Sequence, residues 1–447
     1  MNYNKPITRH TFRKMCMLLF TCMLIMLSCE KNNENKKDNI DYDSRKPIEL
    51  SGFYPDSGWY QEKVMLEGKN FGTDPAQIRV WFNQKRAPVI GSTGTRMYVQ
   101  APRLPGDTCT ISIAIGKDSV VYDQKFRYFA SVTVTTVAGT GESGYRDGDL
   151  TQAIVAPRYV CVDGEGNIFI QCRYMDDQGN TDYRAFARVD EEANELITID
   201  RTMTGNVPVA DPITGVITFP TEATVGQVYS CDPREFWGPR KKELRFPDDY
   251  PGKPANGYKH AMAYNPEDGY LYCRYYYGDI IKINPNTYEV ERIYKTVQGD
   301  NFGLTFSPLE PNILYMSFHS NAGTCANSIC SIDVTDPDNT FKKLSGSTAG
   351  GFRDGPLETA QFREPNQIMC DNDGNIYVAD KLNHCIRRIT PEKMVETVLG
   401  FPQTAGFKDG TKDEALFNKP TGIGIAKDGT VYVGDNGNKR LRKLSIN

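Results

Sequence analysis

Apolar and polar residues alternate over short runs along most of this chain, and turn-forming segments separate the runs. In the first such region, residues 47–129, the runs include Ile78-Arg79-Val80-Trp81-Phe82 and Thr110-Ile111-Ser112-Ile113-Ala114-Ile115. Alternation with a period of two turns one side of a run toward a core and the other toward solvent, which is typical of β-strands. The region is therefore predicted to be a small antiparallel β-sandwich.

The rest of the chain is internally periodic. The stretch GFRDGPLETAQFREPNQIMCDNDGNIYVADKLNHCIRRI (351–389) recurs as GFKDGTKDEALFNKPTGIGIAKDGTVYVGDNGNKRLRKL (406–444), with Asp354 and Asp380 in register with Asp409 and Asp435. A weaker copy occupies 144–171, and three further units with the same strand rhythm lie at 211–232, 260–284 and 302–321. Each unit can bury its faces only against its neighbours, so six units are predicted to close into a ring of β-sheets.

The sequence also indicates which strand closes the ring. The last unit stops after Leu441-Arg442-Lys443-Leu444, which is too short to supply four strands. The strand-like run Val132-Thr133-Val134-Thr135-Thr136-Val137 precedes the first unit. We expect this run to complete the final sheet and to fasten the ring.

Both regions resemble known families. The segments SGFYPDSG, LEGKNFG (66–72), VWFNQKRAPV and APRLPG resemble the IPT/TIG immunoglobulin-like domain, and the repeats at 351–389 and 406–444 resemble NHL repeats. The resemblance implies an all-β protein, with an IPT/TIG sandwich over 46–130 followed by a six-bladed NHL-type β-propeller over 131–447.

Composition agrees with this class and excludes one type of partner. The 447 residues include 39 Gly, 26 Pro and 25 Tyr, which favours short strands and turns over long helices. The net charge is −4 and the basic residues are scattered. Because nucleic-acid binding needs clustered Lys and Arg to neutralise phosphates, no nucleic-acid partner is expected.

The N-terminus has the pattern of a targeting segment. Basic residues precede the apolar run Met15–Leu27, which is too short to span a bilayer as a permanent helix. Leu27-Ser28-Cys29 resembles a bacterial lipobox, which implies cleavage before Cys29 and acylation of that residue. We therefore expect a lipoprotein signal peptide over 1–28, a disordered tether over 29–45, and a lipid anchor in the outer membrane. The acidic residue just after the cysteine resembles a surface-export signal of gut Gram-negative anaerobes, which favours the cell surface, while the periplasmic side stays open. The alternative is an ordinary cleaved signal with an incidental cysteine.

Nine cysteines remain beyond Cys29, and this odd number excludes complete pairing within one chain. Most lie within apolar strand patterns and lack the paired spacing of a zinc site, so buried free thiols are expected. Cys325 and Cys330 are the one pair close enough in sequence to suggest a bond.

Candidate ligand-binding residues follow from the repeat and the family resemblance. In related propellers, the loops that join blades and those that join second to third strands share the face that carries the binding site. Aromatic rings flanked by polar groups suit a sugar, because a ring can stack on C–H groups while polar atoms bond hydroxyls. Burial between blades is the simpler interpretation for each tyrosine alone, whereas the cluster favours a site. The predicted set is Tyr174, Trp237, Arg274, Tyr275, Tyr276, Tyr277 and His319.

No catalytic residues, metal or cofactor are predicted. His260, His319 and His384 would fall near the same face, and three imidazoles can hold zinc. His384, however, lies in an N-H-x-I-R segment common in NHL repeats, where it need not bind anything. The sequence also has no G-x-S-x-G motif and no phosphate-binding loop.

The expected function is therefore binding. A lipid tether, an immunoglobulin-like domain and a propeller together resemble auxiliary nutrient-binding lipoproteins of gut anaerobes, which implies an oligosaccharide or other small nutrient as ligand and an outer-membrane transporter complex as partner. Two alternatives remain open at this stage. One is a lyase or hydrolase with a metal bound by His260 and His319, and the other is a scaffold that binds another protein.

Overall fold

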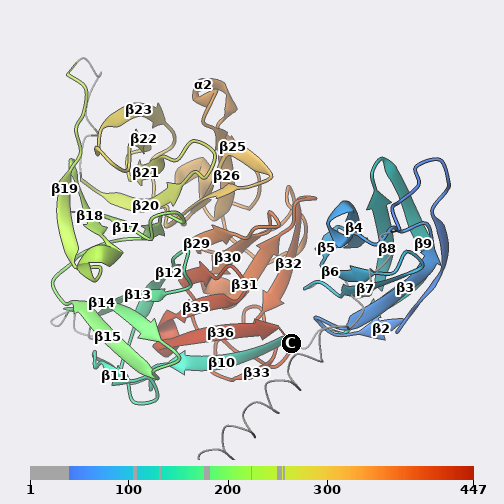
Figure 1. Ribbon diagram of the computed structural model, residues 1–447. Helices are drawn as coiled ribbons and strands as arrows, with labels where there is room; N and C mark the ends of the chain where they lie inside the picture. Colours follow the sequence, from blue (N-terminus) through green and yellow to red (C-terminus); the bar gives the residue numbers. More distant parts are fainter. Residues whose placement is uncertain are drawn as a thin grey trace, which may run out of the picture. The chain divides into compact units, whose positions relative to one another are not determined.

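The computed structural model of this protein describes residues 40–103, 108–129, 132–175, 182–222, 224–248, 254 and 257–446. Contacts within the chain divide it into two compact units, Met1–Ala130 and Ser131–Asn447. Strands are the main regular secondary structure of both units (Figure 1). The predicted signal peptide, Cys29 and most of the predicted tether lie outside the described residues.

The first unit is the predicted sandwich, and its strands pair antiparallel except for the short parallel pairing of Ser57–Gly58 with Arg127 and Tyr128. One sheet has the order β1 (Glu49–Tyr54), β3 (Lys63–Lys69), β7 (Arg96–Gln100), β6 (Val89–Ser92). The other has the order β2 (Ser57–Gly58), β9 (Asp118–Tyr128), β8 (Thr108–Ile115), β4 (Ile78–Phe82), β5 (Lys85–Ala87), and the 3₁₀ turn η1 (Pro75–Gln77) precedes β4. Alternate residues of these strands are buried in one core, including Val64, Leu66, Val80, Phe82, Ile111 and Ile113.

The described strands of the second unit form six antiparallel sheets, which we number as blades along the chain. Blade 1 contains β12 (Pro157–Val162), β13 (Ile168–Met175), β14 (Asp182–Asp190) and β15 (Glu195–Asp200), with β11 (Gly148–Asp149) at its edge. Blade 2 contains β16 (Val209–Ala210), β17 (Ile217–Pro220), β18 (Gln227–Cys231) and β19 (Pro239–Glu243). Blade 3 contains β20 (Lys259–Tyr264), β21 (Leu271–Tyr275), β22 (Asp279–Ile283) and β23 (Val290–Lys295).

The remaining blades follow the same antiparallel plan. Blade 4 contains β24 (Gly303–Ser307), β25 (Glu310–Phe318), β26 (Ser328–Asp333) and β27 (Lys342–Lys343), with the short helix α2 (Pro337–Thr340). Blade 5 contains β29 (Pro365–Cys370), β30 (Ile376–Asp380), β31 (Cys385–Ile389) and β32 (Met394–Leu399), with β28 (Gly355–Pro356) at its edge. Blade 6 contains β34 (Gly422–Ile425), β35 (Val431–Asp435), β36 (Arg440–Ile446) and β10 (Val132–Ala138), with β33 (Gly410–Thr411) at its edge.

The innermost strands close the ring of a β-propeller. Each contacts the innermost strand of the next blade, and β34 contacts β12. The Gln367 side chain joins three of these strands, because its Oε1 accepts hydrogen bonds from the backbone N–H groups of Val160 (3.2 Å) and Ile423 (3.1 Å) while its Nε2 donates to the Val160 carbonyl (2.8 Å).

The predicted closing strand is confirmed. Strand β10 pairs antiparallel with β36, from Val132 opposite Ile446 to Ala138 opposite Leu441, and with β33 on its other side (Figure 1). The final sheet therefore takes its fourth strand from the start of the propeller.

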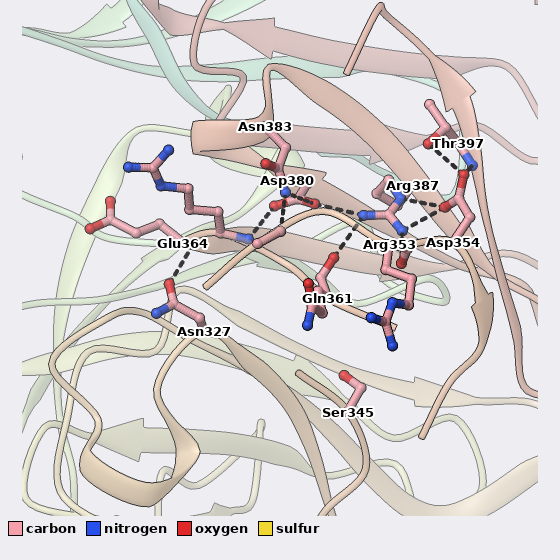
Figure 2. Close-up of polar contacts among 12 residues, drawn as sticks. Asn327, Ser345, Arg353, Asp354, Gln361, Glu364, Asp380, Asn383, Arg387 and Thr397 are labelled. Atoms are coloured by element: carbon pink, nitrogen blue, oxygen red, sulfur yellow. Dashed lines mark hydrogen bonds and ion pairs between the residues drawn. The ribbon is translucent and has the colours of Figure 1, made fainter. Parts of the chain in front are cut away.

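The aligned aspartates of the two plain repeats form a buried network in each blade. In blade 5, Asp380 accepts hydrogen bonds from Asn383 Nδ2 (2.8 Å), the backbone N–H of Arg363 (2.8 Å) and Arg387 Nη1 (2.9 Å) (Figure 2). The Arg387 guanidinium also donates through Nε to Asp354 (2.9 Å). Both Asp380 and Arg387 are fully buried, so the Asp-x-x-Asn pattern of this blade is structural.

Blade 6 contains the same network, except that one backbone donor comes from β10 and not from an ordinary fourth strand. Arg442 bonds Asp435 and Asp409 at 2.9 Å each. In blade 5, Asp354 accepts a hydrogen bond from the backbone N–H of Thr397 in β32. In blade 6, Asp409 accepts one from the backbone N–H of Thr136 in β10. The closing strand thus occupies the place of an ordinary fourth strand.

All nine described cysteines are free, and eight of them are buried, as expected from the sequence. The thiols of Cys325 and Cys330 are hydrogen-bonded to each other, which lowers the pKa of Cys325 to about 7. In the part of the chain that the structure describes, no helix is long and apolar enough to span a membrane.

Candidate ligand-binding site

The two ends of the propeller carry different loops. We call the end with the second-to-third-strand turns and the connections between blades the loop face, and the other end the opposite face. Because successive strands of a blade are antiparallel, residues at the start of an innermost strand and at the end of a second strand lie at the loop face.

Two adjoining cavities open at the loop face. The first, of about 350 Å³, is called the basic cavity and is lined by Arg158, Arg173, His319, Asn366, Lys381, Thr421 and Asn436. The second, of about 300 Å³, is called the mixed cavity and is lined by Arg158, Gln171, Arg173, Arg184, Thr204, Gly205, Asn206, Glu222 and Tyr258. They share Arg158 and Arg173, so together they span blades 1, 2, 4, 5 and 6.

His260, at the start of β20, is nearly buried beneath this face. Its ring stacks on Phe302 at 4.7 Å between centroids and meets Tyr276 edge-on at 5.9 Å. Glu222 and Asp300 lie 4.0 and 3.7 Å from its two nitrogens. Burial, with a smaller contribution from nearby arginines, lowers the pKa of His260 to about 3, so the imidazole is neutral at physiological pH.

His319, directly after β25, also contacts Phe302, in an edge-on arrangement with 5.0 Å between ring centroids. Asn366 Oδ1 accepts the backbone N–H of Gln367, so its Nδ2 is the donor toward His319 Nε2 at 3.0 Å. Nε2 must then be an acceptor, which places the ring proton on Nδ1. Burial lowers the pKa of His319 to about 3, and this ring is also neutral.

Arg158 lines both cavities and lies near the two imidazoles. Its guanidinium stacks over the rings of Tyr159 (5.1 Å) and Phe302 (5.3 Å), which fixes the side chain without removing its charge. Lys381, in the turn after β30, donates to Glu364 at 2.6 Å. Permanent positive charge is therefore held beside neutral imidazole and amide groups.

Three tyrosines border the loop face next to His260. The side chains of Tyr258 and Tyr277 are exposed, while Tyr276 is half-buried and meets Tyr277 edge-on at 5.2 Å. Tyr276 and Tyr277 lie in the turn between β21 and β22, as the repeat predicts. These rings are accessible for stacking against a ligand.

Two predicted ligand-binding residues are core residues. Arg274 is fully buried, stacks on Phe318 at 4.6 Å and donates through Nη1 to the Gly299 carbonyl at 2.9 Å. Tyr275 is fully buried and donates its hydroxyl hydrogen to the Val225 carbonyl at 2.6 Å. Both side chains point into blade packing, because alternate residues of β21 face opposite sides of the sheet.

The placement of Trp237 at the loop face was wrong. Residues 232–238 form the turn between β18 and β19, the third and fourth strands of blade 2, which lies at the opposite face. Trp237 packs on Phe169 at 5.1 Å between centroids. The connection between blades 2 and 3 begins only after Glu243.

Tyr174 and His384 are the remaining residues that the sequence analysis singled out. Tyr174 belongs to β13, but its side chain lies outside the described residues. His384 Nδ1 accepts the backbone N–H of Lys419 at 3.1 Å, consistent with a role in packing between blades. Among the described residues, no group of three or more His, Cys, Asp or Glu side chains is arranged to hold a metal ion.

Sequence reasoning missed the polar residues that line the cavities. Arg158 and Asn366 lie at the starts of innermost strands, and Arg173 lies near the end of a second strand. A polar residue at the start of an innermost strand, or near the end of a second strand, was the sequence signal that could have identified the cavity lining. The predicted set relied on aromatic residues and therefore left these polar side chains out.

The fold and the site together define a propeller with an open polar mouth, joined to an immunoglobulin-like domain. Residues 47–128 match the IPT/TIG domain model, and residues 417–444 match the NHL repeat model. Both matches agree with the resemblances seen in the sequence.

Similar proteins fall into two groups. The protein SUPPRESSOR OF QUENCHING 1 of Arabidopsis thaliana is 36% identical over 98 residues, covering 22% of this chain and 9% of that protein. This chain thus spans about a tenth of that relative. A solved protein of unknown function from Bacteroides thetaiotaomicron is 25% identical with a TM-score of 0.76, over 91% of this chain and 100% of that one. An auxiliary nutrient binding protein from the same species is 22% identical with a TM-score of 0.57, over 91% and 99%.

Proposed function

We propose that this protein is a non-catalytic nutrient-binding protein that holds an oligosaccharide at the loop face. The observation that carries the proposal is the pair of adjoining polar cavities at the mouth of the propeller, one of them lined by Tyr258, with Tyr276 and Tyr277 on the same face. Polar groups that converge beside exposed rings suit a sugar, which offers both hydroxyls and apolar ring faces.

The similarity to an auxiliary nutrient binding protein extends over nearly the whole of both chains. At 22% identity it supports the shared fold alone, and the cavities supply the rest of the argument. A nutrient-binding role would place this protein beside an outer-membrane transporter complex.

The direct test is a glycan-array screen of the soluble chain from Asp43 onward, followed by calorimetry with the glycans that bind. Tyr276→Ala is expected to weaken binding by about threefold to tenfold, because one aromatic stacking contact contributes about 0.5–1.5 kcal/mol. The melting temperature should change little, since Tyr276 is only half-buried.

Trp237→Ala is the matched control, because it removes an aromatic ring at the opposite face. It should lower the melting temperature through lost packing on Phe169 and leave affinity unchanged. Equal affinities for the Tyr276 variant and the wild type, with every glycan that binds, would exclude the loop face as the site.

A hydrolase or lyase is the second candidate, and one observation favours it. His260 and His319 both contact Phe302, and Glu222 and Asp300 lie close to His260. Turnover of a bound glycan, lost in both His260→Gln and His319→Gln, would replace binding by catalysis as the function. We favour binding because both imidazoles are packed beneath the surface.

Anchoring is a separate part of the proposal and rests on the lipobox-like Leu27-Ser28-Cys29. In a Gram-negative host, Cys29→Ala is expected to abolish acylation, because the acylated thiol would be absent, and to remove the protein from the outer-membrane fraction. Membrane fractionation with metabolic labelling by palmitate checks this. An unlabelled wild-type protein that sediments with membranes to the same extent as the variant would contradict it.

A further inference from the structure

A row of apolar side chains crosses the outer face of the sandwich sheet that contains β1, β3, β7 and β6 (Figure 1). Tyr54 of β1 lies opposite Met65 of β3, and Met65 lies opposite Tyr98 of β7. Tyr98 in turn lies opposite Gly91 of β6, where a register shift leaves Ile90 as an extra residue. We call Tyr54, Met65 and Tyr98 the sandwich strip.

The sandwich strip points away from the core of the sandwich. Alternate residues of a strand face opposite sides of a sheet, and the neighbouring strand residues are buried in the core: Phe53, Val64, Leu66, Met97 and Val99. The side chains of Tyr54 and Tyr98 are 74% and 45% exposed, and Ile90 at the end of the strip is 53% exposed. Two aromatic rings are therefore accessible on one flat surface.

Polar side chains flank the sandwich strip on both sides. Glu67 and Arg96 lie two residues further along β3 and β7, on the same face, and form an ion pair at 3.1 Å. Lys63 and Gln100 lie opposite each other two residues away in the other direction. This face thus has an apolar centre with hydrogen-bonding groups along both edges.

The spacing of the two rings suits an extended sugar chain. Tyr54 and Tyr98 lie on strands separated by one other strand, so their Cβ atoms are about 10 Å apart, or roughly two sugar units of an extended chain. A β-1,4-linked glycan is a flat ribbon with apolar ring faces and with hydroxyls along its edges. One chain can therefore stack on both rings while its hydroxyls reach the flanking polar rows.

A protein partner fits this surface less well than a glycan does. A standard protein interface buries about 800 Å² on each side, whereas the sandwich strip is a single row of side chains. The centres of protein interfaces are also depleted in charged residues, but Lys63 and Glu67 lie only about 7 Å along β3 from Met65. The narrow apolar row with polar edges favours a sugar as the occupant.

We propose that the sandwich strip is a second carbohydrate-binding surface, which binds an extended β-1,4-linked glycan by stacking on Tyr54 and Tyr98. The inference goes beyond the proposed function, because the strip belongs to the other unit of the chain and its chemistry does not depend on the loop face.

The test is calorimetry of the chain without residues 1–29, with cellohexaose, xylohexaose and β-1,4-mannohexaose as probes. At least one of them is expected to bind about threefold to tenfold more tightly than the disaccharide of its own series, because a disaccharide can stack on only one of the two rings. Maltohexaose, whose α-linked chain coils, should bind more weakly than the best of the three.

Tyr98→Ala is expected to weaken binding of the best hexasaccharide by about threefold to tenfold, and Tyr54→Ala combined with it by about tenfold to hundredfold. Tyr98→Phe keeps the ring and should bind like the wild type. Trp81→Ala is the matched control, because Trp81 of β4 lies on the outer face of the other sheet and its loss should leave affinity unchanged. Thermal unfolding of each variant checks that it is folded.

Equal affinities for the wild type and the folded double variant would overturn the inference. If Tyr276→Ala weakens that same binding, the glycan is held at the loop face and the proposed function stands. An equal loss in Tyr98→Phe and Tyr98→Ala would exclude ring stacking and overturn the inference as well. Failure of all three β-1,4-linked hexasaccharides to bind would also overturn it, while the glycan-array screen still decides the proposed function.

Discussion

Replacing Asp380 by alanine is expected to destabilise the propeller by about 3–5 kcal/mol, which is the usual cost of removing one partner of a buried ion pair. The variant would leave the Arg387 guanidinium fully buried without its inner carboxylate (Figure 2). Asn383 Nδ2 and the backbone N–H of Arg363 would lose an acceptor at the same time. Urea unfolding, followed by a signal specific to the propeller, measures the change.

Two control variants make the experiment decisive. Asp435→Ala should produce a loss of similar size, because Asp435 bonds Arg442 and Asn438 in the same way in blade 6. Asp413→Ala should change stability by less than about 0.5 kcal/mol, since Asp413 is exposed and pairs with Lys412 at the surface. A small loss for Asp380→Ala and Asp435→Ala alike would show that the networks contribute little to stability.

The second large expected effect concerns the proton affinity of two buried histidines. His260 and His319 are expected to remain neutral from pH 8 down to about pH 4, because burial lowers each pKa from 6.5 to about 3. That shift corresponds to more than a thousandfold loss of proton affinity. In a chain from Asp43 onward only His384 remains as a third histidine, so NMR of labelled imidazoles can follow all three. His384→Gln assigns the third signal, and a ring of His260 or His319 that titrates near pH 6.5 would contradict the burial.

These pKa shifts also act on stability, with a definite sign. Unfolded histidine binds protons more tightly than His260 or His319 does in the fold, so the stability they contribute is present above pH 6.5 and is lost as pH falls toward 3. Burial raises the pKa of Asp380 and Asp435 to about 6, and their contribution has the opposite sign. The folding stability that these two carboxyls contribute is present below pH 3.8 and is lost as pH rises through 6. Because the two contributions oppose each other, the NMR titration is more informative than a melting profile.

The sequence was sufficient to predict the architecture because the fold depends on repeated patterns. Alternation along 78–82 and 110–115 predicted sandwich strands, and the register of Asp380 with Asp435 located two equivalent blades. The predicted closing strand at 132–137 followed from counting strands in the last repeat. Each of these predictions used a periodic sequence pattern, either hydrophobic alternation or a repeat, that the packing of strands requires.

The site could be predicted only in part, because its residues are not periodic. Tyr276 and His319 lie at the loop face as expected, but Tyr275 differs from Tyr276 by one position in a strand and is buried for that reason. Trp237 was misplaced because the sequence does not fix where the short strand β19 begins. Arg158 stands alone in an apolar run, and only the ring geometry brings it beside His319 and Lys381.

The position of β10 has a consequence for how the chain folds as it is synthesised. Strand β10 leaves the ribosome before any blade of the propeller, whereas its partner β36 is made last. Until β36 arrives, β10 has an unpaired edge and the first and last blades cannot meet. Ring closure is therefore a late, long-range event, which slows folding and leaves the edge of β10 exposed until β36 is made.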